Sequence, residues 1–86
     1  MDIQEDALVL TPREYYDPCI IGECAKTGRV IYSVEKILDK LQKDFSNGSE
    51  ISEEDLYTMA KEHFEYNILG SYMGKMTPLY MYKLNS

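Results

Sequence analysis

The chain has 86 residues, 44% of them hydrophobic, and carries a formal net charge of −6. A chain of this length folds as a single domain that hides only about 60–65% of its unfolded surface, which leaves a thin core. Its pI near 4.6 argues against direct binding to nucleic acid or to an anionic membrane surface, because both need a positive footprint.

Residues 1–18 are predicted to form an N-terminal arm ahead of a single domain at residues 19–86. Within the arm, the stretch from Thr11 to Glu14 has the chemistry of a helix start, with Thr at the N-cap, Pro at the first position and Glu at the third. Pro18 ends this helix after about one turn. The residues before Thr11 form either a loose tail or a short edge strand.

Residues 19–32 are predicted to form an antiparallel hairpin. Residues 26–28 read KTG, and a three-residue loop that ends in glycine fits a type I turn closed by a left-handed glycine. In this register Gly22 lies opposite Tyr32, whose ring covers the missing side chain.

Residues 33–48 carry the signals of a first long helix. Ser33 is placed to cap it, Glu35 favours the positive end of the helix dipole, and Asn47-Gly48 ends it. Apolar residues recur at helical spacing on the inner face, whereas the outer face mixes both signs of charge and is typical of a solvated surface. The inner positions are Val34, Ile37, Leu38, Leu41 and Phe45.

Residues 52–70 predict a second helix, in which Ser52 and Asp55 approximate a capping box and Gly70 takes a left-handed conformation at the end. The inner face is apolar and includes His63, expected as a hydrogen-bonded core histidine. The outer face is acidic and is the predicted contact for a partner with a basic surface. Its acidic residues are Glu54, Glu62 and Glu65.

Residues 78–83 alternate in the manner of a strand, with Leu79 and Met81 on one face and Tyr80 and Tyr82 on the other. Because the helices are expected over the Leu79 face, we predict that the two tyrosines lie exposed to solvent or against a partner. A second copy of the chain is the favoured partner, since an edge strand readily pairs with its copy. The predicted fold is α+β, a small β-β-α-α-β domain with an antiparallel three-stranded sheet and two helices packed on one face.

Residues 70–77 (GSYMGKMT) resemble a phosphate-binding loop in composition alone. Such a loop has the order G-x-x-x-x-G-K-[ST] and lies between a strand and a following helix, so that the helix N-terminus faces the phosphates. Here the glycines are one residue closer, Met76 separates Lys75 from Thr77, and a helix precedes the loop. We therefore expect Gly74 to serve a turn, and we expect no nucleotide to bind there.

Cys19, Cys24 and His63 are the candidate soft metal ligands and the candidate nucleophile and base. Without a C-x-x-C or H-x-x-x-H pair the metal signal is weak, and nothing local favours a reactive thiolate. An odd spacing on one strand points the two cysteines to opposite faces, so we expect no disulfide between them. We predict no metal, no cofactor and no enzymatic activity. The sequence shows neither an apolar run of about 18 residues nor a charged-then-apolar leader, so we expect no membrane span and a cytoplasmic location.

Two stretches, YDPCIIG at residues 16–22 and EHFEYNILGSYMGKMTP at residues 62–78, resemble a family of small proteins found in phage and bacterial genomes. In that family a helix with a Glu-x-Phe-Glu-aromatic-Asn run closes on a glycine, an aromatic residue, a second glycine and Thr-Pro. The resemblance covers roughly residues 16–82. The matching residues of the second stretch are Glu62, Phe64, Glu65, Tyr66, Asn67, Gly70, Tyr72, Gly74, Thr77 and Pro78.

The resemblance carries no established biochemical activity and so transfers no catalytic residue. It implies a phage or mobile-element setting, in which small acidic proteins are often inhibitors of host enzymes. We expect a non-enzymatic protein that blocks a host protein in the host cytoplasm, such as a defence or nucleic-acid-handling enzyme. The alternative is a homo-oligomeric accessory domain without a defence role, with a homodimer as its simplest form.

Overall fold

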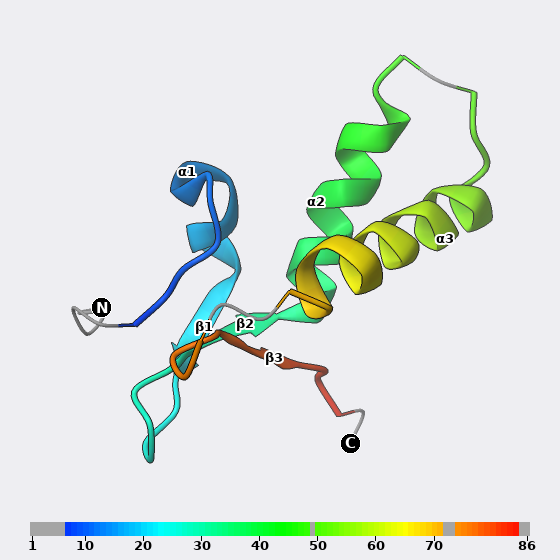
Figure 1. Ribbon diagram of the computed structural model, residues 1–86. Helices are drawn as coiled ribbons and strands as arrows, with labels where there is room; N and C mark the ends of the chain where they lie inside the picture. Colours follow the sequence, from blue (N-terminus) through cyan, green and yellow to red (C-terminus); the bar gives the residue numbers. More distant parts are fainter. Residues whose placement is uncertain (1–6, 49, 72–73, 85–86) are drawn as a thin grey trace.

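The computed structural model describes residues 7–48, 50–71 and 74–84 (Figure 1). Tyr72 of the family resemblance and the first six residues of the N-terminal arm lie outside these ranges. The elements, in chain order, are helix α1 (Arg13–Tyr16), 3-10 turn η1 (Asp17–Cys19), strands β1 (Ile20–Glu23) and β2 (Val30–Ser33), helices α2 (Val34–Ser46) and α3 (Glu53–His63), π-helical segment η2 (Phe64–Leu69) and strand β3 (Leu79–Met81). The chain is a small α+β domain with the predicted order of two strands, two long helices and a third strand. Within the described ranges, no helix is both long and apolar enough to span a membrane.

The sheet has the order β1-β2-β3, so β2 is central and the other two strands form its edges. β1 and β2 are antiparallel, but β2 and β3 are parallel, which corrects the prediction of a wholly antiparallel sheet. The reason lies in where β3 begins, because Thr77, just before β3, lies beside the start of β2, where Arg29 Nε donates to the Thr77 carbonyl oxygen. β3 therefore runs in the same direction as β2, with Leu79 opposite Ile31.

The hairpin of β1 and β2 is shifted by one residue from the predicted register. Gly22 lies opposite Ile31 instead of Tyr32, and a β-bulge between Ile20 and Gly22 shifts the pairing by one more residue, so that Tyr32 lies opposite Ile20. The Cys24 amide donates to the Arg29 carbonyl at 2.8 Å, so the loop between them takes four residues rather than three. The glycine that closes the loop has a φ of 76°, the left-handed conformation that the sequence predicted.

The two long helices begin at the predicted caps. The Ser33 hydroxyl accepts from the Lys36 amide at 3.2 Å, and the Ser52 hydroxyl accepts from the Asp55 amide at 3.3 Å. Gly48, after the end of α2, has a φ of 75°, as predicted. Local signals in the sequence therefore place both helices along the chain.

The core lies between the sheet and the two long helices, which cover the same face of the sheet (Figure 1). Ile20, Tyr32 and Tyr80 form a row across that face, and neither Tyr32 nor Phe64 has exposed surface. Leu10 joins this core from the N-terminal arm, and its amide donates to the Tyr32 hydroxyl at 2.8 Å. Part of the arm thus contributes to the core of the domain.

The second long helix changes geometry where α3 passes into η2. Its buried residues, Leu56, Ala60, Phe64 and Ile68, are four apart in the sequence. In an α-helix a spacing of four residues drifts by about 40° per step, so the last of the four would leave the inner face. The wider π turn offsets this drift and keeps Ile68 buried.

Gly70 ends η2 in a right-handed conformation with a φ of −76°, which corrects the left-handed conformation predicted from the sequence. Its amide donates to the Glu65 carbonyl at 3.1 Å, which is the five-residue hydrogen bond of a π turn. Because this bond already satisfies the helix end, no left-handed glycine is needed there. Gly74 has a φ of 114°, as the predicted turn requires.

Candidate functional site

The candidate metal ligands of the sequence do not form a cluster in the described part of the chain, where no three His, Cys, Asp or Glu side chains gather closely enough to hold a metal ion. Cys19 is buried in η1, Cys24 follows β1, and both are free thiols. Burial raises the pKa of Cys19, whereas hydrogen bonds from Thr27 lower the pKa of Cys24. The two thiols therefore differ in surroundings, one in the interior and one at the hairpin loop.

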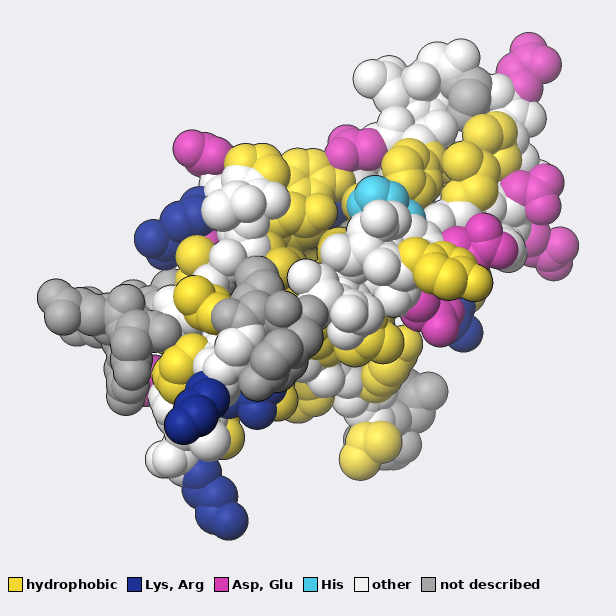
Figure 2. Space-filling view, viewed as in Figure 1, with side chains coloured by type: hydrophobic (Ala, Val, Ile, Leu, Met, Phe, Trp, Pro, Cys, Tyr) yellow, Lys and Arg dark blue, Asp and Glu magenta, His cyan; other side chains and the backbone are white. Residues whose placement is uncertain are grey.

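The predicted acidic residues lie on the outer side of the second long helix, and Glu54, Glu62 and Glu65 are all exposed. Figure 2 shows Asp and Glu side chains gathered over α3, with hydrophobic side chains between them. The ion pairs of the described residues lie elsewhere, between α1 and η1 and along α2. Within the described ranges the three glutamates therefore have no ion-pair partner.

Hydrophobic side chains that the sequence analysis did not assign to this surface lie among the glutamates. Tyr66 is 81% exposed, Leu69 is 47% exposed and Tyr57 is 45% exposed. Tyr66 follows Glu62 by four residues, which places both on one side of the helix. Helical spacing predicts that Tyr66 lies on the outer side of the helix, because Phe64 and the buried residues four positions from it occupy the inner side. We call Glu54, Tyr57, Glu62, Glu65, Tyr66 and Leu69 the α3–η2 surface.

Tyr80 and Tyr82 do not form the exposed tyrosine face that the sequence predicted. The Tyr80 ring packs edge-on against Phe64, with ring centroids 5.5 Å apart, and stacks on Tyr32 at 6.0 Å. Met81, predicted on the covered face, is 45% exposed, and Tyr82, just after β3, is 52% exposed. The helices therefore cover the face of the strand opposite to the predicted one.

The Tyr80 hydroxyl is buried and has no hydrogen-bond partner among the described residues. Burial, and then the nearby phenols of Tyr32 and Tyr16, raise the pKa of Tyr80 to about 12. A buried hydroxyl without a partner is unfavourable. An unpartnered hydroxyl such as that of Tyr80 is therefore unusual in a protein core.

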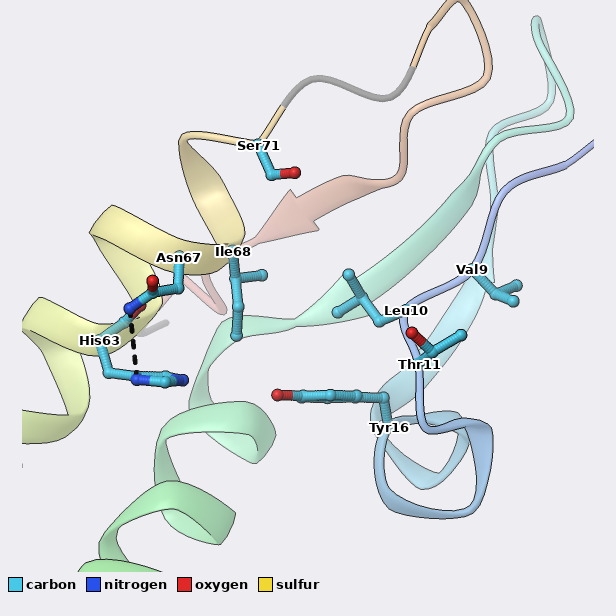
Figure 3. Close-up of a pocket in the computed structure, with 8 residues that line it drawn as sticks. All are labelled: Val9, Leu10, Thr11, Tyr16, His63, Asn67, Ile68 and Ser71. Carbon is cyan, nitrogen blue, oxygen red and sulfur yellow. Dashed lines mark hydrogen bonds between the residues drawn. The ribbon is translucent and has the colours of Figure 1, made fainter.

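A hollow of about 250 Å³ lies between the N-terminal arm and the end of the second long helix (Figure 3). His63 lies at its edge, partly buried, and its Nδ1 is 3.3 Å from the Asn67 side-chain nitrogen. The His63 ring also meets the Phe45 ring edge-on, with centroids 5.8 Å apart. His63 is hydrogen-bonded as predicted, but it is only partly buried and does not belong to the core cluster, which corrects the prediction of a core histidine. It lines this hollow instead.

No family model matches the chain, and no similar protein was found among curated proteins or solved structures.

Proposed function

We propose that the chain is a small, acidic, non-enzymatic protein that binds a basic surface of another protein through the α3–η2 surface and inhibits it. The observation that carries this proposal is the 81% exposure of Tyr66, beside glutamates that form no ion pair within the described part of the chain. Tyrosine supplies a large contact area with few rotatable bonds and is enriched among the residues that dominate binding energy. Carboxylates around such an anchor attract a basic partner and raise the association rate.

The proposed target is a protein of the host cell, in particular a defence or nucleic-acid-handling enzyme. Such enzymes bind phosphate backbones through basic surfaces, and a protein with a net charge of −6 is suited to compete for them. The resemblance of residues 16–82 to small phage and bacterial proteins supports the host cytoplasm as the setting. The chain itself is not proposed to bind nucleic acid, because two negative surfaces repel each other.

The test is a charge reversal on the α3–η2 surface with a matched control. Glu62→Lys combined with Glu65→Lys changes the net charge as much as Glu23→Lys combined with Glu50→Lys, whose residues are also exposed but lie outside the surface. The partner is captured from host lysate with the wild-type chain and identified by mass spectrometry, and its affinity is then measured by calorimetry. We expect the first variant to weaken binding about tenfold or more, and the control about threefold or less. Equal weakening by both variants would show that only the overall charge matters, and would remove the α3–η2 surface from the proposal.

The anchor role of Tyr66 has a separate test. Tyr66→Ala is expected to weaken binding by about 2 kcal/mol, which is about 30-fold. Because the anchor is apolar in the main, this loss is expected at low and at high salt alike, whereas the loss from charge reversal shrinks as salt rises. An affinity that is unchanged in Tyr66→Ala at both salt concentrations would contradict the anchor.

The alternative function, a homo-oligomeric accessory domain, is favoured by one observation. β3 is an edge strand, and Met81 and Tyr82 beside that edge are 45% and 52% exposed, so the strand is open to pairing with a second copy. Met81→Lys combined with Tyr82→Ala is expected to convert such a dimer into monomers, as measured by light scattering. A chain that stays monomeric at high concentration removes this alternative, whereas self-association without capture of any host protein removes the inhibitor.

A further inference from the structure

The hollow between the N-terminal arm and the second long helix is lined from two directions (Figure 3). Leu10 and the Tyr16 ring come from the arm and α1, and His63, Asn67 and Ile68 come from α3 and η2. None of its described lining residues is a lysine, arginine, aspartate or glutamate. The hollow thus combines apolar walls with polar groups that carry no fixed charge.

The His63 ring has a fixed orientation in the hollow. The Asn67 side-chain nitrogen lies 3.3 Å from His63 Nδ1 and 3.2 Å from the His63 carbonyl oxygen. The carbonyl is an acceptor, so the atom beside it is the amide NH₂ group, which donates to both. His63 Nδ1 is therefore the acceptor and Nε2 carries the proton. Figure 3 shows the Nε2 end of the ring turned toward Tyr16, across the hollow.

The Tyr16 hydroxyl faces this donor from the opposite side (Figure 3). Burial, followed by the neighbouring Cys19 and Asp44, raises the pKa of Tyr16, so the phenol keeps its proton at neutral pH. A protonated phenol both donates and accepts a hydrogen bond. A ligand between the two rings therefore meets a donor from His63 and a donor or acceptor from Tyr16.

The unpartnered Tyr80 hydroxyl is an independent observation from the same neighbourhood. Tyr16, which lines the hollow, is one of the phenols that raise the pKa of Tyr80. Leu10, which also lines the hollow, donates its amide to Tyr32, on which the Tyr80 ring stacks. Tyr80 is not a lining residue of the hollow, so its hydroxyl belongs to the core next to these walls.

We propose that the hollow binds a neutral, planar heterocycle of nucleobase size. The ring of such a ligand packs against Leu10 and Ile68, and its polar edge takes the hydrogen bond from His63 Nε2 and bonds the Tyr16 hydroxyl. A charged ligand is disfavoured, because burying a charge without an opposite charge beside it is costly. The volume of about 250 Å³ lies just below the ~300–1,000 Å³ of sites for drug-sized molecules, which limits the ligand to a small ring system. This site is separate from the α3–η2 surface and does not depend on its function.

The test is a nuclear magnetic resonance titration of the full chain with free adenine, cytosine, uracil and hypoxanthine. At least one base is expected to shift the backbone amide signals of Leu10, Thr11, Ile68 and Ser71 in a saturable way. Tyr16→Phe, which removes one hydroxyl, is expected to weaken this binding about fivefold. Tyr15→Phe is the control, because its hydroxyl bonds Asp44 and its side chain does not line the hollow.

Three results overturn the proposal. None of the four bases gives saturable shifts at the solubility limit, or the two tyrosine variants bind alike, or adenosine monophosphate binds more tightly than adenine, which would indicate a site for an anion. Thermal melting of both variants confirms that each is folded. If Tyr16→Phe does not fold, Thr11→Val replaces it, since the Thr11 hydroxyl also lines the hollow, and the same fivefold loss is expected.

Discussion

β3 and η2 each contain a tyrosine, and one of the two is buried whereas the other is exposed. Tyr80 of β3 packs in the core against Phe64 and Tyr32, whereas Tyr66 of η2 is 81% exposed. The sequence predicted the reverse for β3 and left Tyr66 unassigned. The difference shows that helical spacing predicts which side chains are buried, whereas strand alternation does not predict which face is covered.

A strand of alternating residues has two faces, and here both faces are apolar enough to be covered. Leu79 and Met81 lie on one face, and Tyr80 and Tyr82 lie on the other. The alternation therefore predicts a strand, but it does not predict which of the two faces is buried. The pairing with β2 decides, because Tyr80 lies opposite Tyr32, which is fully buried. A shift of one residue would exchange the two faces. A helix with one charged side has no such ambiguity.

The largest effect is expected from the two sides of η2. Phe64→Ala should lower the free energy of unfolding by about 3–5 kcal/mol, because Phe64 has no exposed surface and its removal leaves a cavity. Tyr66→Ala should change it by less than about 0.5 kcal/mol, as for most surface positions. Urea unfolding followed by circular dichroism measures both. If Phe64→Ala does not fold, Phe64→Leu is expected to show a smaller loss of the same sign, and equal losses at the two positions would show that η2 is packed differently.

The second-largest effect on stability is expected from Tyr80 in β3, with Tyr82 just after β3 as its comparison. Tyr80→Ala should destabilise the fold by about 2–4 kcal/mol, because it removes a ring that contacts Phe64 and Tyr32. Tyr82→Ala, at a position that is 52% exposed, should cost less than about 0.5 kcal/mol. Thermal melts of the two variants beside the wild type are sufficient. A larger loss from Tyr82→Ala would restore the face assignment that the sequence suggested.

The parts of the fold that local chemistry decides were predictable. Ser33 and Ser52 start the two long helices as expected, and Gly48 follows the end of the first. The direction of β3 was not predictable, because nothing in the sequence says at which end of the sheet β3 begins. The π turn was also missed, although the regular spacing of four between the buried residues of that helix is a signal for it.

The candidate site was also predictable only in part. Glu54, Glu62 and Glu65 are exposed as predicted because helical spacing sets their side of the helix. The hollow was not predictable, because it forms where the N-terminal arm packs beside His63, and contacts between distant segments leave no local pattern. The prediction of an arm apart from the domain concealed this contact, since Leu10 belongs to the core.

A smaller effect on stability is expected from Gly74, which lies between η2 and β3. Gly74 has a φ of 114°, and a Cβ added there meets nothing within 4 Å. Gly74→Ala should therefore destabilise the fold by about 1 kcal/mol through backbone strain alone. Lys75→Ala, at the exposed neighbouring position, should be nearly neutral. A neutral Gly74→Ala would mean that the turn before β3 is different, and ATP binding that vanishes in Lys75→Ala would restore the phosphate loop.

The smallest effect at neutral pH is expected from Tyr80→Phe, which removes the orphaned hydroxyl and keeps the ring. Because a buried hydroxyl without a partner is unfavourable, and this one has no hydrogen-bond partner among the described residues, its loss should raise the free energy of unfolding by about 0.5–1 kcal/mol. Urea unfolding at pH 7 gives the comparison with Tyr80→Ala, which separates the ring from its oxygen.

At alkaline pH the ionisation of the Tyr80 hydroxyl changes the free energy of unfolding. In the folded chain burial raises the pKa of Tyr80 to about 12, whereas the unfolded phenol titrates near its ordinary pKa of about 10. The folded state therefore holds this proton more tightly, so the contribution is fully present below pH ~10 and is lost as the pH rises toward ~12. Between these values the wild type should lose stability more steeply than Tyr80→Phe, since the unfolded variant lacks this ionisation. Urea unfolding of both chains at steps across that range measures the slopes. Parallel slopes would mean that the Tyr80 hydroxyl is not buried, and would return Tyr80 to the surface where the sequence had placed it.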